Sequence, residues 1–393
     1  MARLIEITGK ALSGEWGTDD ETGEGIPVLR TTNFTNEGVV NYNDVVTRKI
    51  TKKNINDKFL RKGDIIIEKS GGSDKFPVGR VIYFDGVENT YLFNNFTGLL
   101  RVKDREVWYP RYIFYSLYAN YKRGGTRSFE NKTTGLHNLK TDTYVEQFEV
   151  GEKSKKEQVS ICNKLDKLHD VMKLREQELQ MLNDLIKARF VEMFGDPVKN
   201  EKGWITDTVD SLCIEIYGGG TPSKAHPEYY EDGDIPWVSS KDMKTDILTD
   251  SQIKINQVGV ENSTARMVPV NSVVMVIRSG ILKHTLPVAI NAVPITVNQD
   301  LKVFIPSERI LTRFLAVQFK MHEKDILTGV RAVTADNIEF NSLKQRKLIV
   351  PSIELQQEYV SFLKQIDKSK VAVQKSLDKA QQLFDSLMQK YFG

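Results

Sequence analysis

The sequence has few cysteines, few histidines and no long apolar run, and each scarcity excludes a class of protein. No stretch of the 393 residues reaches the roughly 18 apolar residues that a membrane span requires, and the start, MARLIEITGK, lacks the apolar core of a signal peptide. Cys162 and Cys213 fit neither a disulfide framework nor a metal cluster, because no C-x-x-C spacing is present and the histidines are scattered. We therefore expect a cytoplasmic protein with no membrane contact, no metal and two reduced, structural cysteines.

Catalytic signatures are also missing. An amino-methyltransferase is expected to carry an Asn/Asp-Pro-Pro-aromatic element, yet the sequence has no Pro-Pro pair, and the glycines at 218–220 lack the spacing of a dinucleotide loop. No Walker-type loop is present, and nuclease-like tripeptides such as Asp300-Leu301-Lys302 occur about as often as chance predicts. The sequence therefore predicts a non-catalytic chain without a cofactor.

Charge is nearly balanced, which limits what the chain can bind alone. The 55 lysines and arginines oppose 52 acidic residues, so the formal net charge is only +3. Any binding to nucleic acid must come from local basic clusters. This balance argues against a solitary high-affinity DNA binder and leaves room for a complex in which other subunits supply phosphate contacts.

What the sequence does contain is a long internal repeat. The segment that begins KEQVSICNKLDKL at Lys156 matches the segment that begins QEYVSFLKQIDKS at Gln357 without a gap, at an offset of 201 that aligns Leu182 with Leu383. Each segment then reaches a glycine at which a helix is expected to stop. The repeat predicts two long helices.

The globular parts of the repeat match more loosely, at offsets near 201 to 209. GEGIPVLRTTNF resembles DGDIPWVSSKDM, and FLRKGDIIIEKSGG resembles MVPVNSVVMVIRSG. Apolar runs such as DIIIEK and SVVMVIR predict buried strands, while RYIFYSLYA and RFLAVQF predict short amphipathic helices, so each domain is expected to be α/β or α+β. The predicted order is domain, helix, domain, helix, with the bounds 1–150, 151–195, 196–352 and 353–393.

Each predicted long helix carries one apolar stripe at 3-4 spacing. Packing the two equivalent helices together closes the molecule most simply as an antiparallel coiled coil with an internal pseudo-two-fold axis. About 35 residues at 1.5 Å each make a rod of roughly 50 Å, the length of about 15 base pairs of B-DNA. The stripe can serve intramolecular packing alone, or residues off it can also dock partner subunits. The predicted pairing residues are Ile161, Leu165, Leu168, Met172, Leu179, Leu182, Ile186, Phe362, Ile366, Val373, Ala380, Leu383 and Leu387.

Taken together, these features resemble the DNA-specificity subunit of a type I restriction-modification system. The resemblance rests on the domain and helix order, on the opening GGGTPSKAHPEYYEDGDIPWVSSKDM, on the helix exit ARFVEMFGDP and on VPSIELQQEYV. It implies two target recognition domains that each read half of a split, asymmetric site in double-stranded DNA. It also implies helices that set the gap and dock two adenine methyltransferase subunits, with restriction subunits joining the complex. The first domain departs from the pattern, because it lacks the GGTPS signature and the proline seen at Pro351.

The GGGTPS opening admits two roles. Gly218, Gly219 and Gly220 are expected to permit a tight backbone turn above packed aromatic residues. Scaffolding at the start of the domain is our preferred interpretation, and direct base contact is the alternative. The aromatic residues concerned are Tyr229, Tyr230 and Trp237.

Base reading needs donors and acceptors in the groove, and lysine, arginine and small polar residues to contact phosphates. In the first domain, the candidates from two stretches are Lys69, Ser70, Ser73, Lys75 and Arg80, then Lys122, Arg123, Arg127, Asn131 and Lys132. In the second domain they are Arg278, Ser279, Lys283 and His284, then Arg331, Thr334 and Asn337. The alternative for each is an ordinary solvated loop residue.

Two other functions compete with DNA recognition. A coiled-coil scaffold whose domains bind proteins would show no salt-dependent duplex binding, even within a full complex. RNA recognition would favour aromatic stacking platforms exposed on a sheet, whereas the aromatics here mostly occupy apolar periodic segments. We rank the scaffold second and RNA recognition last.

Overall fold

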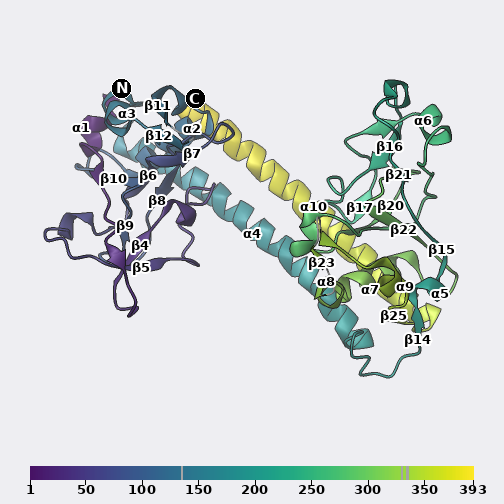
Figure 1. The fold of residues 1–393 in the computed structure, drawn as a ribbon. Coiled ribbons are helices and arrows are strands. Elements are labelled where there is room, and N and C mark those ends of the chain that lie inside the picture. The colour runs from purple at the N-terminus through teal and green to yellow at the C-terminus, as the bar shows by residue number, and fades with distance from the viewer. Residues whose placement is uncertain (134–135, 329–330, 333–335) are drawn as a thin grey trace. The chain divides into compact units, whose positions relative to one another are not determined.

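The computed structural model describes residues 1–133, 136–328, 331–332 and 336–393 (Figure 1). Within these ranges, side chains are described for all residues except those at 132–136 and 329–336. The chain forms two compact units. Unit 1 consists of Met1–Glu176 and Lys375–Gly393, and unit 2 consists of Gln177–Gln374. Each long helix therefore contributes one half to each unit.

Among its described residues, unit 1 combines short helices with four small sheets. The main antiparallel sheet has the order β2 (Leu12–Ser13), β10 (Thr97–Leu100), β6 (Ile65–Glu68) and β8 (Val81–Tyr83). A second sheet has the order β3 (Thr18–Asp19), β5 (Val46–Lys49), β4 (Ile26–Leu29) and β9 (Leu92–Phe93). A third has the order β11 (Glu130–Thr133), β12 (Leu136–Leu139) and β7 (Ser70–Gly72), and β1 (Ala2–Arg3) pairs with β13 (Glu149–Val150). The helices are α1 (Leu4–Thr8), α2 (Pro110–Lys122) and α3 (Thr141–Gln147), with 3-10 turns at Thr31–Asn33, Asn56–Lys58 and Arg127–Phe129.

Unit 2 has a comparable composition of elements. Its main sheet has the order β15 (Cys213–Gly218), β22 (Leu301–Pro306), β19 (Val273–Val276), β20 (Val288–Asn291) and β17 (Ile247–Leu248). A smaller sheet has the order β18 (Lys254–Ile255), β16 (Ile235–Val238) and β21 (Thr296–Val297). The remaining pairs are β14 (Thr206–Thr208) with β25 (Lys347–Ile349) and β23 (Arg331–Ala332) with β24 (Asp336–Asn337). The helices are α5 (Val209–Leu212), α6 (Gln257–Glu261), α7 (Thr312–Met321), α8 (Glu323–Thr328) and α9 (Phe340–Lys344), with 3-10 turns at Pro227–Tyr229 and Gly280–Lys283.

The predicted buried strands and short helices are present in both units. The run Ile65–Glu68 forms β6 and Val273–Val276 forms β19, and every residue of both strands is buried. α2 begins with Pro110 at a position where a helix needs no N–H donor, and buries most of its residues. α7 is the matching helix of unit 2. The apolar patterns therefore specified the cores correctly.

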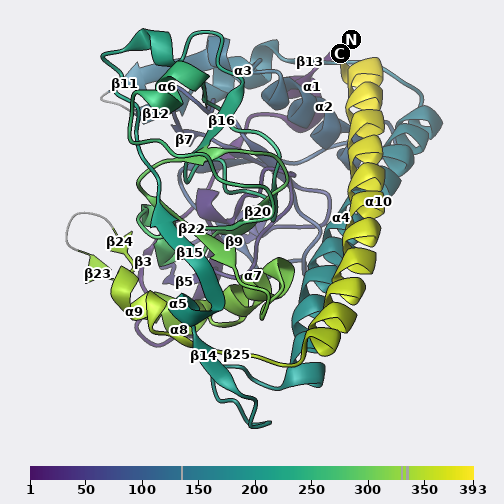
Figure 2. The same cartoon turned by 90° about the vertical axis from the view of Figure 1, so that its right-hand side faces the viewer.

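Two long helices, α4 (Lys155–Phe194) and α10 (Ile353–Phe392), each contain 40 residues and lie side by side in two views (Figures 1 and 2). They are antiparallel. In unit 1 the beginning of α4, with Leu165, shares a core with Met388 near the end of α10. In unit 2 the end of α4, with Phe190, packs on Tyr359 near the beginning of α10. The structure confirms the predicted fold class of mixed domains joined by an antiparallel helix pair.

The ends of the two helices correspond at an offset of 198, three residues less than the best sequence match. Lys155 corresponds to Ile353 as the first residue, and Phe194 corresponds to Phe392 as the last. Three residues are nearly one helical turn, so both offsets align similar faces. The helix ends therefore follow an offset of 198, whereas Asp166 and Asp367, which pair with Arg111 and Arg313, keep the offset of 201.

The difference between the two offsets explains one wrong pairing residue. Leu383 was placed in the seam because the offset of 201 aligns it with Leu182, but its side chain is 50% exposed. The structural offset aligns Leu383 with Leu185, which is 46% exposed, and aligns Ile186 with the buried Phe384. Of the other predicted residues, Ile161, Leu165, Ile366, Val373 and Ala380 are buried. The half-buried ones are Leu168, Met172, Leu179, Leu182, Ile186, Phe362 and Leu387.

The GGGTPS opening forms scaffold, although not through a tight turn. The expected tight turn is absent, because Gly218 ends β15, residues 219–220 have no turn assignment and none of the three has a positive φ. Instead, a side chain at Gly219 would overlap the carbonyl of Val297, so the glycine permits close backbone approach. The indole of Trp237 is buried and donates to the carbonyl of Gly220 at 3.0 Å. Packing therefore accounts for Gly219, Gly220 and Trp237.

Candidate nucleic-acid interface

In unit 1, the two stretches that the sequence offered as DNA-reading loops lie together. β7 and β12 pair through Ser70 and Asn138, and the N–H of Leu139 donates to the carbonyl of Lys69 at 2.8 Å. β12 also pairs with β11, which carries the exposed Asn131. Residues separated by about sixty positions thus meet on one three-stranded sheet.

A tight turn follows β7 and is held by several contacts. The N–H of Ser73 donates to the carbonyl of Phe76 at 2.7 Å, and the N–H of Phe76 donates to Oγ of Ser73 at 3.1 Å. Arg127 donates to the carbonyls of Asp74 and Lys75 at 3.2 and 3.3 Å. The ammonium of Lys75 lies 5.2 Å from the ring centroid of Phe76, which is 56% exposed. Arg127 from the second stretch thus holds the turn of the first stretch in place. The turn presents the ammonium of Lys75 and the ring of Phe76 together.

Two basic candidates have partners inside the unit. Nζ of Lys69 donates to Oγ of Ser13 at 3.0 Å, and burial lowers the pKa of Lys69. Arg80 donates to the carbonyls of Phe34 and Thr31 at 3.0 and 2.9 Å and lies 3.4 Å from the buried Glu68. Burial raises the pKa of Glu68, because the charged carboxylate loses contact with water, and the guanidinium of Arg80 favours the charged form. We therefore assign Arg80 a structural task.

The remaining candidates of unit 1 lie at the end of α2 and on β11. Lys122 is exposed, and its ammonium lies 5.3 Å from the ring centroid of Tyr118. Arg123 donates to the carbonyl of Phe392. The side chain of Lys132 lies outside the described residues. Arg123 thus secures the end of α10.

Unit 2 brings its two candidate stretches together in the same way. Arg278 forms a backbone bridge with Asn337, and the N–H of Ile338 donates to the carbonyl of Ile277 at 2.8 Å. This hydrogen bond corresponds to the one between Leu139 and Lys69 in unit 1. The equivalence adds Asn138 as a candidate, because it occupies the position of Asn337. Sequence reasoning missed Asn138 because its pairing with Ser70 is a long-range contact that no local pattern contains.

The side chains around this bridge are mostly exposed. Arg278 contacts Asp300 through Nε at 2.7 Å and Nη2 at 2.6 Å. Oγ of Ser279 accepts from the N–H of Ile281 at 3.5 Å, which caps the following 3-10 turn. Lys283, His284 and Asn337 are exposed. The side chains of Arg331 and Thr334 lie outside the described residues.

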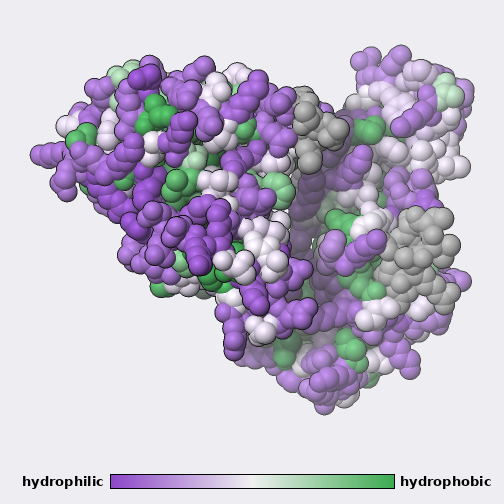
Figure 3. Space-filling view, turned by 60° about the vertical axis from the view of Figure 1, so that its left-hand side comes forward, coloured by the Kyte–Doolittle hydropathy of each residue, from purple (hydrophilic) through white to green (hydrophobic). Residues whose placement is uncertain are grey.

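Most of the surface nearest the viewer in Figure 3 is hydrophilic, and its hydrophobic residues form separate spots. Such a surface suits a charged polymer better than an obligate protein interface. Among the described residues, no group of three or more His, Cys, Asp and Glu side chains could hold a metal ion. No helix within the described part of the chain is long and apolar enough to cross a bilayer. Cys162 and Cys213 are free thiols, and burial raises the pKa of both.

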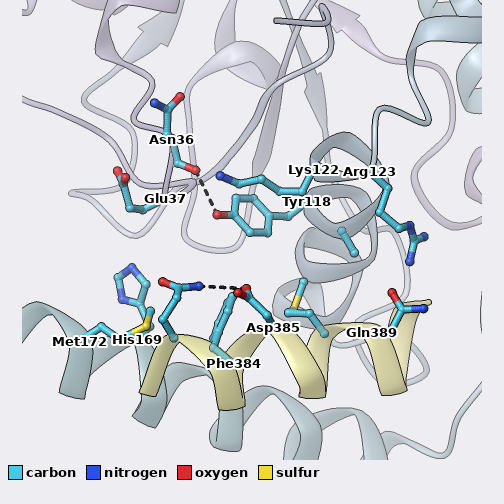
Figure 4. A pocket seen from close by; sticks show the side chains of 13 residues that line it. Asn36, Glu37, Tyr118, Lys122, Arg123, His169, Met172, Phe384, Asp385 and Gln389 are labelled. Atoms are coloured by element: carbon cyan, nitrogen blue, oxygen red, sulfur yellow. Dashed lines mark hydrogen bonds between the residues drawn. The ribbon is translucent and has the colours of Figure 1, made fainter. Parts of the chain in front are cut away.

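A groove of about 310 Å³ lies in unit 1 between α2, the paired helix halves and the loop at Asn36 (Figure 4). The hydroxyl of Tyr118 donates to the carbonyl of Asn36 at 3.0 Å across one side of it. Unit 2 has a groove of about 330 Å³ between α7 and its own helix halves. The two grooves occupy equivalent places in the repeat, and both are candidate docking sites.

One face of α4 is apolar but not buried. Val171, Leu174, Met181 and Leu185 are between 40% and 68% exposed. Their spacing of three, seven and four residues places them on one side of the helix, away from the seam. Off-seam residues are therefore available for a partner.

Comparison with known proteins gives a consistent family. The profile of the type I restriction modification DNA specificity domain matches residues 4–184 and again 201–381. The chain is 39% identical over 153 residues to the EcoR124I/EcoR124II specificity subunit of Escherichia coli, covering 38% of each chain. It is 29% identical over 193 residues to the MjaIX specificity subunit of Methanocaldococcus jannaschii, covering 47% of this chain and 43% of that one. The aligned segments thus span less than half of either relative.

Two solved structures show the same fold. A type I restriction-modification S subunit from M. genitalium superposes with a TM-score of 0.59 at 16% identity, covering 100% of this chain and 95% of that one. A chain from a structural study of complex assembly and conformational transition in the type I R-M system superposes with a TM-score of 0.56 at 14% identity, covering 100% and 96%. At these identities the likeness concerns the fold alone.

Proposed function

The chain belongs to the family of type I restriction-modification DNA specificity domains, and on that premise we propose that it is the non-catalytic subunit that reads the DNA sequence for such a complex. The observation that carries the proposal is the repeated loop pairing. Ser70 meets Asn138 in unit 1, and Arg278 meets Asn337 in unit 2. Each unit thus assembles polar and basic side chains on a fixed backbone, as base reading requires.

Each unit reads one half of a split site, and the two halves differ. Unit 1 presents Lys75 and Arg127 at the turn after β7 and Asn131 on β11, whereas unit 2 presents Arg278, Lys283 and Asn337. Different donors and acceptors select different base edges. A wrong base pair in either half is expected to weaken binding by roughly 1 to 3 kcal/mol.

The helix pair sets the gap between half-sites and docks the catalytic subunits. α4 and α10 both cross from one unit to the other, so a change in their length alters the spacing of the two reading surfaces. Two equivalent grooves and the exposed apolar face of α4 suit two copies of an adenine methyltransferase subunit, with ATP-dependent restriction subunits completing the complex. The complex acts on cytoplasmic double-stranded DNA.

Modified-base sequencing of the source genome tests the proposal. Deletion of this gene is expected to remove methyladenine from one split motif. Replacement of residues 1–150 by the corresponding part of another specificity subunit is expected to change one half-site only. Equal insertions in α4 and α10 are expected to change the gap and neither half.

The competing scaffold function predicts a different result. Under it, the methyladenine pattern survives deletion although the methyltransferase is expressed, and the purified complex shows no salt-dependent duplex binding. An exchange of residues 1–150 that altered both half-sites would contradict the division of labour between the units.

A further inference from the structure

A second basic surface lies in unit 1, outside the candidate residues described above. It is an open groove of about 1090 Å³ beside α1, β2 and the segment after β10. Five basic residues line it, namely Lys10, Arg61, Arg101, Lys103 and Arg105. The acidic residues that line it are Asp57 and Glu88. The groove is therefore cationic in a chain whose overall charge is nearly balanced.

The groove lies beside the edge strand of the main sheet, which is short in unit 1. β2 pairs with β10 only at Leu12 and Ser13, whereas β15 of unit 2 pairs with β22 from Gly218 to Cys213. In unit 1 the chain before β2 turns away at Gly9, whose φ is 76°. A Cβ at Gly9 would lie 2.9 Å from Cε of Lys103, so the lysine stem lies directly against this glycine.

The charges in the groove are not equally available. Arg101 donates to the fully buried Asp64 at 2.8 and 2.6 Å and to the carbonyls of Asp57 and Phe59 at 2.9 and 2.8 Å. Its charge is therefore balanced inside the fold. Arg105 donates to a backbone carbonyl, that of Lys62, at 2.8 Å, which leaves its charge unneutralised.

Three further cations, Lys10, Arg61 and Lys103, are exposed at the groove. Opposite them, Glu88 accepts from the N–H of Lys62 at 3.0 Å and Asp57 lies in a 3-10 turn. Together with Arg105, four cations face two carboxylates once Arg101 is set aside. This excess favours a polyanion.

One strand, β2, links the groove to the candidate reading residues. Leu12 lines the groove, and the next residue, Ser13, accepts a hydrogen bond from Nζ of Lys69 at 3.0 Å. Lys69 in turn precedes β7. We propose that this groove binds the phosphodiester backbone of duplex DNA next to the half-site that unit 1 reads. The inference rests on the proposed function and adds the surface that fixes the register of that unit on the duplex.

Phosphate contacts add affinity without sequence preference and release counterions, so they are measured through salt dependence. The triple variant Lys10→Gln, Arg61→Gln and Lys103→Gln removes three charges and leaves Arg101 and Arg105 with their internal partners. The experiment measures binding of the complete methyltransferase complex to fluorescent duplexes, with and without the methylated motif, over a series of salt concentrations. We expect the slope of log affinity against log salt to fall by about 2 to 3 for both duplexes. Modified-base sequencing should find methyladenine in the same split motif with the triple variant as with the wild type.

The control is Lys49→Gln, Lys52→Gln and Lys53→Gln, which removes the same charge from exposed positions elsewhere in unit 1. An unchanged slope in the groove variant, or an equal fall in the control, overturns the groove assignment. Failure of the groove variant to assemble with the methyltransferase, measured by gel filtration, also overturns it and indicates an acidic protein segment as the ligand. If the wild-type complex shows no salt-dependent binding, the proposed function fails as well.

Discussion

The two units agree most closely where they join the long helices and differ most at their outer surfaces. Gln158 and Gln356 are both fully buried near the start of a long helix. Oε1 of each accepts from the N–H that precedes the short helix, Tyr109 at 2.8 Å and Leu311 at 2.9 Å. Their Nε2 atoms donate to equivalent carbonyls as well. The glutamine at the junction therefore makes the same contacts in both units.

The outer surfaces have diverged around this common junction. Unit 1 has a two-residue edge strand and a cationic groove, whereas unit 2 has a six-residue edge strand, on which Glu215 pairs with Arg266 at 2.5 Å. Unit 1 places Ser70 opposite an asparagine, and unit 2 places Arg278 there. The difference teaches that attachment to the helices constrains these residues, while the surfaces assigned to DNA are free to vary.

The largest expected effect concerns the register of the repeat. Phe384→Ala removes a buried aromatic side chain from the core of unit 1, so we expect a loss of about 3 to 5 kcal/mol in unfolding free energy. Leu383→Ala changes a half-exposed residue one position away and is expected to cost no more than about 0.5 kcal/mol. Urea denaturation measures both. Equal losses would mean that the seam follows the sequence offset of 201 after all.

The sequence could predict the elements but not this register. Apolar spacing identified both long helices and the buried strands β6 and β19, because burial imposes a 3-4 or continuous apolar pattern on the chain. The offset between the copies was chosen by residue identity, which favours a match displaced by nearly one turn. Helix ends decide the register, and they depend on contacts such as those of Gln158 with other segments.

The candidate site was predicted as separate stretches and not as an assembly. Basic and small polar residues marked the loops, but the pairing of Ser70 with Asn138 is a long-range contact that no local pattern contains. For the same reason, the sequence could not predict the structural role of Arg80, since its acceptors belong to a segment almost fifty residues away. The groove at Lys103 was missed because its residues come from four distant segments.

A second difference between the units concerns their stability at low pH. His322, which caps α7, is buried in unit 2 and neither ring nitrogen has a hydrogen-bond partner within the described part of the chain. Burial, with help from Arg346, lowers the pKa of His322 from 6.5 to about 4, although Asp325 and Asp196 oppose the shift. Unit 1 has Arg123 at the corresponding cap, and arginine does not titrate in this range.

The sign of the pH effect follows from this pKa. Between pH 6.5 and pH 4 the unfolded chain binds a proton at His322 that the folded chain does not, so stability falls as the pH falls. We expect a loss of roughly 3 kcal/mol over this range in denaturation experiments. His322→Leu should remove this part of the pH dependence, while His284→Leu, at an exposed position, should retain it. Identical pH profiles for the wild type and His322→Leu would refute the assignment.

The shared junction predicts equal effects in the two units. Gln158→Leu leaves the N–H of Tyr109 and two carbonyl acceptors without their partner, and Gln356→Leu does the same at Leu311. Each is expected to cost about 2 kcal/mol, because unmet buried polar groups lose water without compensation. Hydrogen exchange locates the loss in the unit that carries the substitution. A large cost in one unit and none in the other would show that the junctions are not equivalent.

The smallest expected difference lies beside that junction. Asp166 accepts from Nε of Arg111 at 2.8 Å and from the hydroxyl of Tyr115 at 2.5 Å, whereas Asp367 accepts from Arg313 alone, at 3.0 Å, among the contacts of the described residues. The position of Tyr115 is taken by Val317 in unit 2, and burial raises the pKa of Tyr115 so that its hydroxyl remains a donor.

Asp166→Asn is therefore expected to cost about 1 kcal/mol, and Asp367→Asn less than about half of that, because partly exposed ion pairs contribute little. A double-mutant cycle with Tyr115→Phe isolates the hydroxyl contribution from that of the arginine. Coupling near zero between Asp166 and Tyr115 would leave the two ion pairs energetically alike.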